Sequence, residues 1–201
     1  AGLSVDDRDW ADKAETIGLP LPHTDVQIVD SEDGRVVEPG QPGEICARGY
    51  GVMHGYYNDL AATQAAIDAE GWLHTGDLGT MDTRGYCKVV GRIKDMIIRG
   101  GENIYPREIE EVLFTHASVA DVAVVGVPDE KWGERVIAFV RPAPPTRPHD
   151  ELAEELRALV RELLAPHKTP REWFFLDELP TTASGKIQKF ALRERYMEER
   201  L

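Results

Sequence analysis

Short apolar runs separated by turns rich in glycine and proline fill the first half of the chain. Val26–Val29 is followed by a turn signal at 32–34, and Glu44–Arg48 follows a second one at 38–43. Such runs bounded by turn residues predict short strands. Two further runs of the same kind are Gly71–His74 and Tyr86–Val90. Many short strands joined by turns predict a small antiparallel, β-barrel-like subdomain.

Helical periodicity is clearest in three segments. Asp59–Ala69 has apolar or small positions three to four residues apart, and Pro106–His116 begins with a proline, which is favoured at the first helical position. Glu151–Leu164 carries a leucine-rich stripe and ends before Pro166. We therefore expect one helix in the first half and two amphipathic helices in the second.

The second half mixes these helices with strands. Val119–Val127 and Arg135–Arg141 are rich in β-branched residues, and Glu172–Leu176 is a shorter run of this type. Phe190–Arg200 predicts a terminal helix, while the four prolines of Pro142–Asp150 indicate a linker. The pattern predicts a compact α+β domain of about 110 residues.

The change of pattern near Gly91 indicates two domains. We place a β-rich piece at residues 1–92 and an α+β domain at residues 93–201, with the boundary inside Gly91–Asp95. The expected fold class is α+β, a barrel-like antiparallel subdomain followed by a compact α+β domain.

Composition narrows the function classes. The 201 residues include 23 Lys and Arg against 36 Asp and Glu, a formal net charge of −13 that disfavours nucleic acid and anionic lipid as partners. No apolar run is long enough for a transmembrane helix, and the acidic start does not resemble a secretory signal. Cys46 and Cys87 suit reduced thiols and a cytoplasmic protein. The six histidines lack metal-ligand spacing, so no metal site is expected.

The common nucleotide and hydrolase motifs are absent. Gly49, Gly51 and Gly55 do not form G-x-G-x-x-G, and Gly185-Lys186 lacks the other residues of a Walker A loop. There is no G-x-S-x-G elbow either. The absence of these motifs leaves the function unassigned at this point.

Four segments taken together are more specific. GEICARG at 43–49 precedes WLHTGDL at 72–78; GRIKDMIIRGGENIYP at 91–106 and LPTTASGKIQK at 179–189 follow. In this order and spacing they closely resemble the adenylate-forming (AMP-binding) enzymes, specifically the acyl-CoA synthetases or fatty-acid–CoA ligases. The resemblance extends from about residue 15 to the end and covers only the C-terminal portion of such an enzyme.

The resemblance implies a two-step reaction. A carboxylate attacks the α-phosphate of ATP, bound with Mg²⁺, to give acyl-AMP; the CoA thiol then attacks acyl-AMP after the C-terminal domain has rotated. The implied partners are a small carboxylic acid, ATP and CoA. The loop that holds the ATP phosphates lies upstream in this family and has no match here, so the chain alone is expected to be inactive.

The resemblance also implies residue roles in adenylation. Asp77 corresponds to the aspartate that binds the ribose hydroxyls, and Arg92 to an arginine that contacts ribose or phosphate. Lys94 occupies the hinge position, and Lys186 is the catalytic lysine that contacts the carboxylate and the α-phosphate. Asp77 as a turn residue, and Arg92, Lys94 and Lys186 as surface residues, are the plainer alternatives.

A second group of residues is implied in CoA binding. Gly101 would line the pantetheine tunnel, and Trp132 would stack on the CoA adenine. Lys168 and Arg171 would meet the CoA phosphates. His167 departs from the aromatic residue common in the family, and Trp132 alternatively packs on the strand pair.

Two other functions stay open at this point. An adenylation domain serving a carrier-protein thiol would share most of these motifs. A module that only binds CoA or a protein partner, without catalysis, belongs to a different class. The form GGENIYP at 100–106 favours the CoA ligase over the carrier-dependent enzyme.

Overall fold

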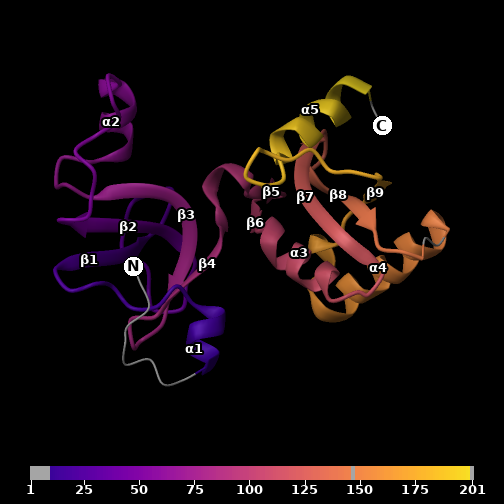
Figure 1. The fold of residues 1–201 in the computed structure, drawn as a ribbon, viewed down its shortest axis with the longest axis horizontal. Coiled ribbons are helices and arrows are strands. Elements are labelled where there is room, and N and C mark those ends of the chain that lie inside the picture. Colours follow the sequence, from indigo (N-terminus) through magenta and orange to yellow (C-terminus); the bar gives the residue numbers. More distant parts are fainter. Residues whose placement is uncertain (1–9, 146–147, 200–201) are drawn as a thin grey trace. The chain divides into compact units, whose positions relative to one another are not determined.

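The computed structural model describes residues 10–145 and 148–199. Within this part the chain divides into two compact units, with the boundary in the sequence between Lys94 and Asp95. The α+β class expected from the sequence is confirmed, because each unit combines helices with mainly antiparallel strands (Figure 1).

The first unit is built on a four-stranded antiparallel meander. Its strands follow the order of the chain, and its inward side chains include Ile28, Ile45, Leu78 and two cysteines. The elements are α1 (Trp10–Glu15), β1 (Thr24–Val29), β2 (Gly43–Gly49), α2 (Leu60–Ala66), β3 (Leu73–Met81) and β4 (Cys87–Arg92).

The expected barrel-like closure is wrong. In the described sheet β1 pairs only with β2, and β4 pairs only with β3, so the two outer strands do not meet. A barrel requires the last strand to pair with the first, and neither outer strand pairs with the other here. The sheet is therefore open.

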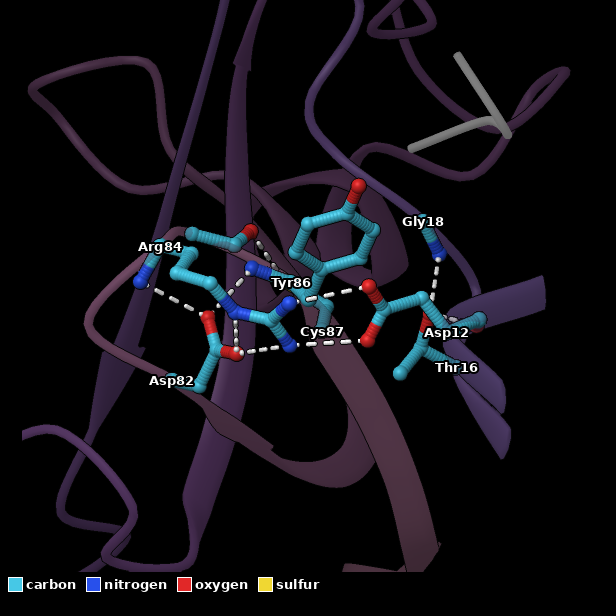
Figure 2. A network of polar contacts seen from close by, with 8 residues as sticks. Asp12, Thr16, Gly18, Asp82, Arg84, Tyr86 and Cys87 are labelled. Carbon is cyan, nitrogen blue, oxygen red and sulfur yellow. Dashed lines mark hydrogen bonds and ion pairs between the residues drawn. The ribbon is translucent and has the colours of Figure 1, made fainter. Parts of the chain in front are cut away.

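The segment before β1 is tied to the β3–β4 hairpin by a polar network (Figure 2). Arg84 donates through both terminal nitrogens to the carboxylate of Asp12, at 2.9 and 2.7 Å, and through Nε to Asp82 at 2.8 Å. Two backbone hydrogen bonds join the same segments: the Cys87 N–H donates to the Gly18 carbonyl, and the Ile17 N–H donates to the Cys87 carbonyl. Helix α1 is thereby anchored to the far end of the sheet, away from the β3–β4 positions that carry the candidate site.

The second unit has helices on both faces of one sheet (Figure 1). The strand order is β6-β5-β8-β7. Strand β8 pairs with β5 at one position only, and farther along it pairs in parallel with β9. Its elements are β5 (Ile97–Arg99), β6 (Glu102–Ile104), α3 (Pro106–Phe114), β7 (Val119–Asp129), β8 (Gly133–Pro142), α4 (His149–Leu163), β9 (Glu172–Phe175) and α5 (Lys189–Glu199). Two 3-10 turns, η1 (Ile93–Asp95) and η2 (Pro166–Lys168), complete the chain.

Alternating side chains of β7 and β8 create two separate cores. Val122, Val124 and Val140 face α3 and α4, which contribute the fully buried Leu113 and Leu156. The intervening residues of the same strands face α5, whose Leu192 and Tyr196 complete the second core together with Ile137 and Phe139. Such alternation is expected for strands covered on both faces. The α5 core also holds the base of the segment that carries Lys186.

Some elements differ from those expected. The strand expected at Gly71–His74 continues to Met81, through glycines that suggested a turn, and α1, β5 and β6 were not expected. Part of the expected linker, residues 146–147, and the end of the expected terminal helix, residue 200, lie outside the described residues.

Candidate functional site

Asp77 and Arg92 form a pair in the first unit. They are directly opposite each other in the β3–β4 ladder, and Arg92 Nε donates to Asp77 Oδ1 at 3.0 Å. The side chains are 37% and 50% exposed, so both remain open to a ligand. Arg92 therefore pairs with Asp77 rather than with the carboxylates of the second unit, of which Glu108 is paired with Lys168. The two residues expected at the ribose are thus brought together.

A bulge in β3 presents Asp77. Glu44 pairs with Leu78 and Cys46 pairs with His74, which leaves Thr75–Asp77 opposite Ile45 alone. Gly76 adopts φ of +70°, a conformation that glycine tolerates without steric cost. β-Bulges commonly redirect a side chain near a functional site. The bulge therefore explains why a glycine stands before the aspartate in the Thr-Gly-Asp motif.

Side-chain contacts hold this bulge to β2. Thr75 Oγ1 donates to the Ile45 carbonyl at 2.7 Å and accepts from the Asp77 N–H at 3.1 Å. Glu44, only 8% exposed, accepts the Gly76 N–H at 2.9 Å. His74 Nδ1 lies 2.8 Å from the other carboxylate oxygen of Glu44.

The same region contains three residues with potential metal-ligand atoms that lie near one another, the one such group found among the described residues. One ligand atom each of Glu44, Cys46 and His74 lies within 4.8 Å of the others. The carboxylate of Glu44 is already engaged by Gly76 and His74, and burial raises the pKa of Cys46 to about 12, which favours the neutral thiol. These contacts suit a hydrogen-bonded network. The expectation of no metal stays a prediction.

Lys94 lies in η1, at the end of the first unit, and is exposed. It is the residue at which the chain passes from one compact unit to the other. Its role as the hinge whose dihedrals change stays a prediction, because one conformation records no rotation.

Gly100 and Gly101 form the turn of the β5–β6 hairpin. Their φ values of +63° and +84° are those that a two-residue type I′ turn requires, and that glycine provides. A Cβ on Gly100 would lie 2.9 Å from the Trp132 ring, whereas a Cβ on Gly101 would meet no described atom within 4 Å. Gly101 was the glycine singled out from the sequence, whereas the glycine that packs on Trp132 is Gly100.

Trp132 is partly exposed and flanked by cations. Arg99 Cζ and Lys131 Nζ lie 5.0 and 4.9 Å from its ring centroid, within cation–π range. The backbone N–H of Trp132 donates to the Asp129 carboxylate, and this hydrogen bond is the largest cause of the lowered pKa of Asp129. Trp132 is 39% exposed, so the ring can also receive a flat partner.

A basic pocket lies beside this tryptophan. An open cavity of about 380 Å³ is lined by Arg99 of β5 and by residues of α4, η2 and the segment that follows η2: Glu154, Arg157, Arg161, Pro166, His167, Thr169, Pro170 and Arg171. Arg161 and Arg171 form no ion pair with any residue that the structure describes, and the hydroxyl of buried Thr169 has no protein partner. Such a concentration of guanidinium groups in an acidic chain favours a phosphate-bearing ligand.

Of the two basic residues expected near this pocket, only Arg171 lines it. Lys168 is bound to Glu108 on α3, with Nζ at 2.6 and 2.8 Å from the carboxylate oxygens, and is largely buried. His167 lines the pocket and pairs with Glu102 at 3.0 Å. Arg157 and Arg161 were not expected from the sequence, and Arg99 was expected only as part of the glycine-containing loop at 99–103. The spacing of Arg157 and Arg161, one helical turn apart on α4, was the available signal.

Lys186 lies at a short hairpin before α5. Thr181 and Ile187 form an isolated bridge, the Thr182 N–H donates to the Lys186 carbonyl, and Gly185 has φ of +80°. Ile187 packs against the α5 core, which anchors the hairpin. Lys186 itself is exposed, and its ammonium group has no hydrogen bond or ion pair with the described residues. The geometry leaves this cation available for a ligand.

Comparison with known proteins adds the family. The model of the AMP-binding enzyme C-terminal domain matches residues 108–186, and that of the AMP-binding enzyme matches residues 1–57. No helix among the described residues is long and apolar enough to cross a membrane.

Named relatives agree with these matches. The chain is 52% identical over 187 residues to YngI of Bacillus subtilis, whose name assigns it to the acyl-CoA synthetases, covering 92% of this chain and 33% of YngI. It is 48% identical over 189 residues to the mitochondrial medium-chain acyl-CoA ligase ACSF2 of Bos taurus, covering 94% of this chain and 30% of the ligase. The chain thus spans about a third of the curated relatives it matches.

Solved structures show the same fold. ATP-bound MatB from Rhodopseudomonas palustris is 34% identical, with a TM-score of 0.83 over 92% of this chain and 36% of MatB. The o-succinylbenzoate CoA synthetase MenE from Bacillus subtilis, in complex with its acyl-adenylate intermediate, is 41% identical, with a TM-score of 0.79 over the same shares. Together these matches assign the chain to the AMP-binding, adenylate-forming enzymes, of which it represents a C-terminal portion.

Proposed function

We propose that this chain is the C-terminal portion of an acyl-CoA synthetase that forms acyl-AMP from a carboxylate and ATP and transfers the acyl group to CoA. The observation that carries the proposal is the second unit's combination of an available lysine on a fixed hairpin with a separate basic pocket beside a partly exposed tryptophan. The first cation suits adenylation, and the second group suits a CoA nucleotide. The names of YngI and ACSF2 support the same reaction.

In the adenylation step, Asp77 would accept hydrogen bonds from the ribose hydroxyls while Arg92 contacts ribose or phosphate. Their mutual hydrogen bond orients the Asp77 carboxylate before the nucleotide arrives. Lys186 would place its ammonium against the carboxylate and α-phosphate oxygens, where negative charge develops. Mg²⁺ would enter with ATP.

In the thioester step, the CoA adenine would lie on Trp132 and its phosphates against Arg171, Arg161 and Arg99. Arg99 or Lys131 must leave one face of the indole for the adenine to stack there. Gly101 would face the pantetheine arm, and Lys94 would act as the hinge between the two steps. Lys168 is a weaker candidate than Arg171, because Glu108 already neutralises it.

The metabolic setting is part of the proposal. A place in fatty acid metabolism follows from relatives named as medium-chain acyl-CoA ligases. A reducing compartment such as the cytoplasm suits the two buried cysteines, both of which are unpaired.

The isolated chain is expected not to form acyl-AMP. Its sequence has no motif that grips the ATP triphosphate, so the reactants cannot be held in attack geometry, which contributes about 7–11 kcal/mol in well-oriented reactions. Carboxylate-dependent exchange of pyrophosphate into ATP measures this directly. Robust exchange by the purified chain would contradict the proposal that a further part is needed.

Arg171→Ala is expected to raise the KM for CoA about tenfold or more in the full-length enzyme, because a hydrogen bond to a charged phosphate contributes about 1.5–3 kcal/mol. The rate of acyl-AMP formation should not change. Arg107→Ala is the matched control, since Arg107 pairs with Glu111 on the exposed side of α3 and does not line the pocket. An unchanged KM for CoA in Arg171→Ala would contradict the proposal that this pocket binds the CoA phosphates.

The acceptor distinguishes the three functions. The full-length enzyme is incubated with ATP and a panel of carboxylates, with either CoA or a phosphopantetheinylated carrier protein, and products are identified by mass spectrometry. We expect acyl-CoA, AMP and pyrophosphate in equal amounts. Acylation of the carrier alone would favour the carrier-dependent enzyme, and absence of any adenylate would favour a non-catalytic binding module.

A further inference from the structure

Glu44 is the most buried carboxylate in the first unit's candidate site, which also contains the more exposed Asp77. It is 8% exposed and lies on β2, the strand beside the Thr75–Asp77 bulge. A buried carboxylate is costly unless its oxygens are hydrogen bonded or paired. The identity of its partners therefore indicates what the buried charge is for.

Both oxygens of Glu44 are directed to the bulge and the residue before it. Oε1 accepts the Gly76 N–H at 2.9 Å, and Oε2 lies 2.8 Å from His74 Nδ1. The Gly76 N–H belongs to the part of β3 that cannot pair regularly with β2, because Ile45 alone faces Thr75–Asp77. Glu44 thus replaces the ladder hydrogen bond that the bulge removes.

His74 is held between two carboxylates. Its Nε2 lies 3.6 Å from Asp68 Oδ2, in the segment before β3, and the Cys46 thiol lies 3.5 Å from Nδ1. The hydrogen bond with Glu44 raises the pKa of His74, which favours the imidazolium. A charged imidazolium balances the buried Glu44 and fixes which way its carboxylate turns.

The bulge leads directly to Asp77. The Asp77 N–H is held by Thr75 Oγ1, and its carboxylate meets Arg92 across β3 and β4. A displacement of Gly76 therefore moves the backbone of Asp77 relative to Arg92. Small displacements of a positioning group are costly in enzyme sites.

We infer that Glu44 and His74 are positioning residues for the nucleotide site: together they hold the Thr75–Asp77 bulge so that the Asp77 carboxylate is set to receive both ribose hydroxyls. This inference rests on the proposed function, because it takes Asp77 as the ribose ligand. In this role neither side chain needs to contact the nucleotide itself.

The test compares ATP with 2′-deoxyATP as substrates for acyl-AMP formation by the full-length enzyme. Asp77→Ala sets the benchmark, since it should abolish most of the preference for ATP. Glu44→Ala should reduce the preference in kcat/KM about tenfold, mainly through the KM for ATP, while the KM for the carboxylate and for CoA stays constant. Glu44→Gln, which retains an oxygen for the Gly76 N–H, should restore part of it.

His74→Ala provides a second route if Glu44→Ala does not fold, because the His74 side chain is 36% exposed and its removal leaves Glu44 in place. It should shift the preference in the same direction. A general loss of stability would lower the activity with both nucleotides equally and leave their ratio unchanged. This inference alone would be overturned if Asp77→Ala loses the preference for ATP while Glu44→Ala keeps it. Where Glu44→Ala does not fold, an unchanged preference in His74→Ala has the same consequence. An unchanged ratio in Asp77→Ala would overturn the ribose assignment and the inference with it.

Discussion

Lys186→Ala in the full-length enzyme is expected to slow acyl-AMP formation on the order of 10²–10³-fold. The ammonium group projects from a fixed hairpin and has no partner among the described residues, so its contribution is available to the transition state. The loss should affect adenylation only. Conversion of chemically supplied acyl-AMP and CoA to the thioester should proceed at nearly the normal rate.

Two variants make this result interpretable. Lys186→Arg keeps the positive charge on a planar group of different shape, and should recover only part of the rate. Lys88→Ala removes an exposed lysine of the first unit, on β4, and should leave both half-reactions unchanged. Quenched time courses of pyrophosphate release and of thioester formation give the two rates separately. Equal losses in both steps for Lys186→Ala would contradict the assignment.

Gly101→Leu is expected to do the reverse, slowing thioester formation about 10²-fold and sparing adenylation. The turn has open space around Gly101, so the leucine can be accommodated in the unit itself and would project from the hairpin. In the thioester step that side chain would occupy the path of the pantetheine arm. The measurement is again each half-reaction by itself.

Backbone strain is the competing explanation for Gly101→Leu. An L-residue at φ of +84° costs roughly 1–2 kcal/mol in the left-handed region. Gly34→Leu is the matched control, because Gly34 has φ of +71° and equally open surroundings in a turn of the first unit. A loss of thioester formation in both variants would trace the effect to strain, and a loss in Gly101→Leu alone would trace it to the side chain.

The second unit was the more predictable part of the fold. Apolar periodicity located α3 and α4, and β-branched runs located β7 and β8, because these elements bury regular faces. The β3 strand was harder, since Gly76 and Gly79 inside it are typical of turns. They are needed there because one adopts a positive φ and the other packs against Ile45.

The candidate site was predictable where one residue carries the chemistry. Asp77, Arg92 and Lys186 were given roles from their motifs, whereas Arg161 lies outside the motifs and Glu44, although inside GEICARG, was given no role. The roles of these last two depend on contacts across strands or on a pocket assembled from α4 and η2. Hydrogen bonds between distant positions leave no periodic pattern in a single sequence.

A chimera tests the central claim most directly. The segment of YngI that corresponds to this chain is replaced by the chain, which is 52% identical to it, and the chimera is assayed for acyl-CoA formation from ATP, CoA and carboxylates that YngI itself accepts. We expect acyl-CoA to form, and its formation to be lost in the chimera with Lys186→Ala. A folded chimera that forms no acyl-CoA, beside an active YngI, would contradict the claim that this chain supplies a working C-terminal portion of an acyl-CoA synthetase.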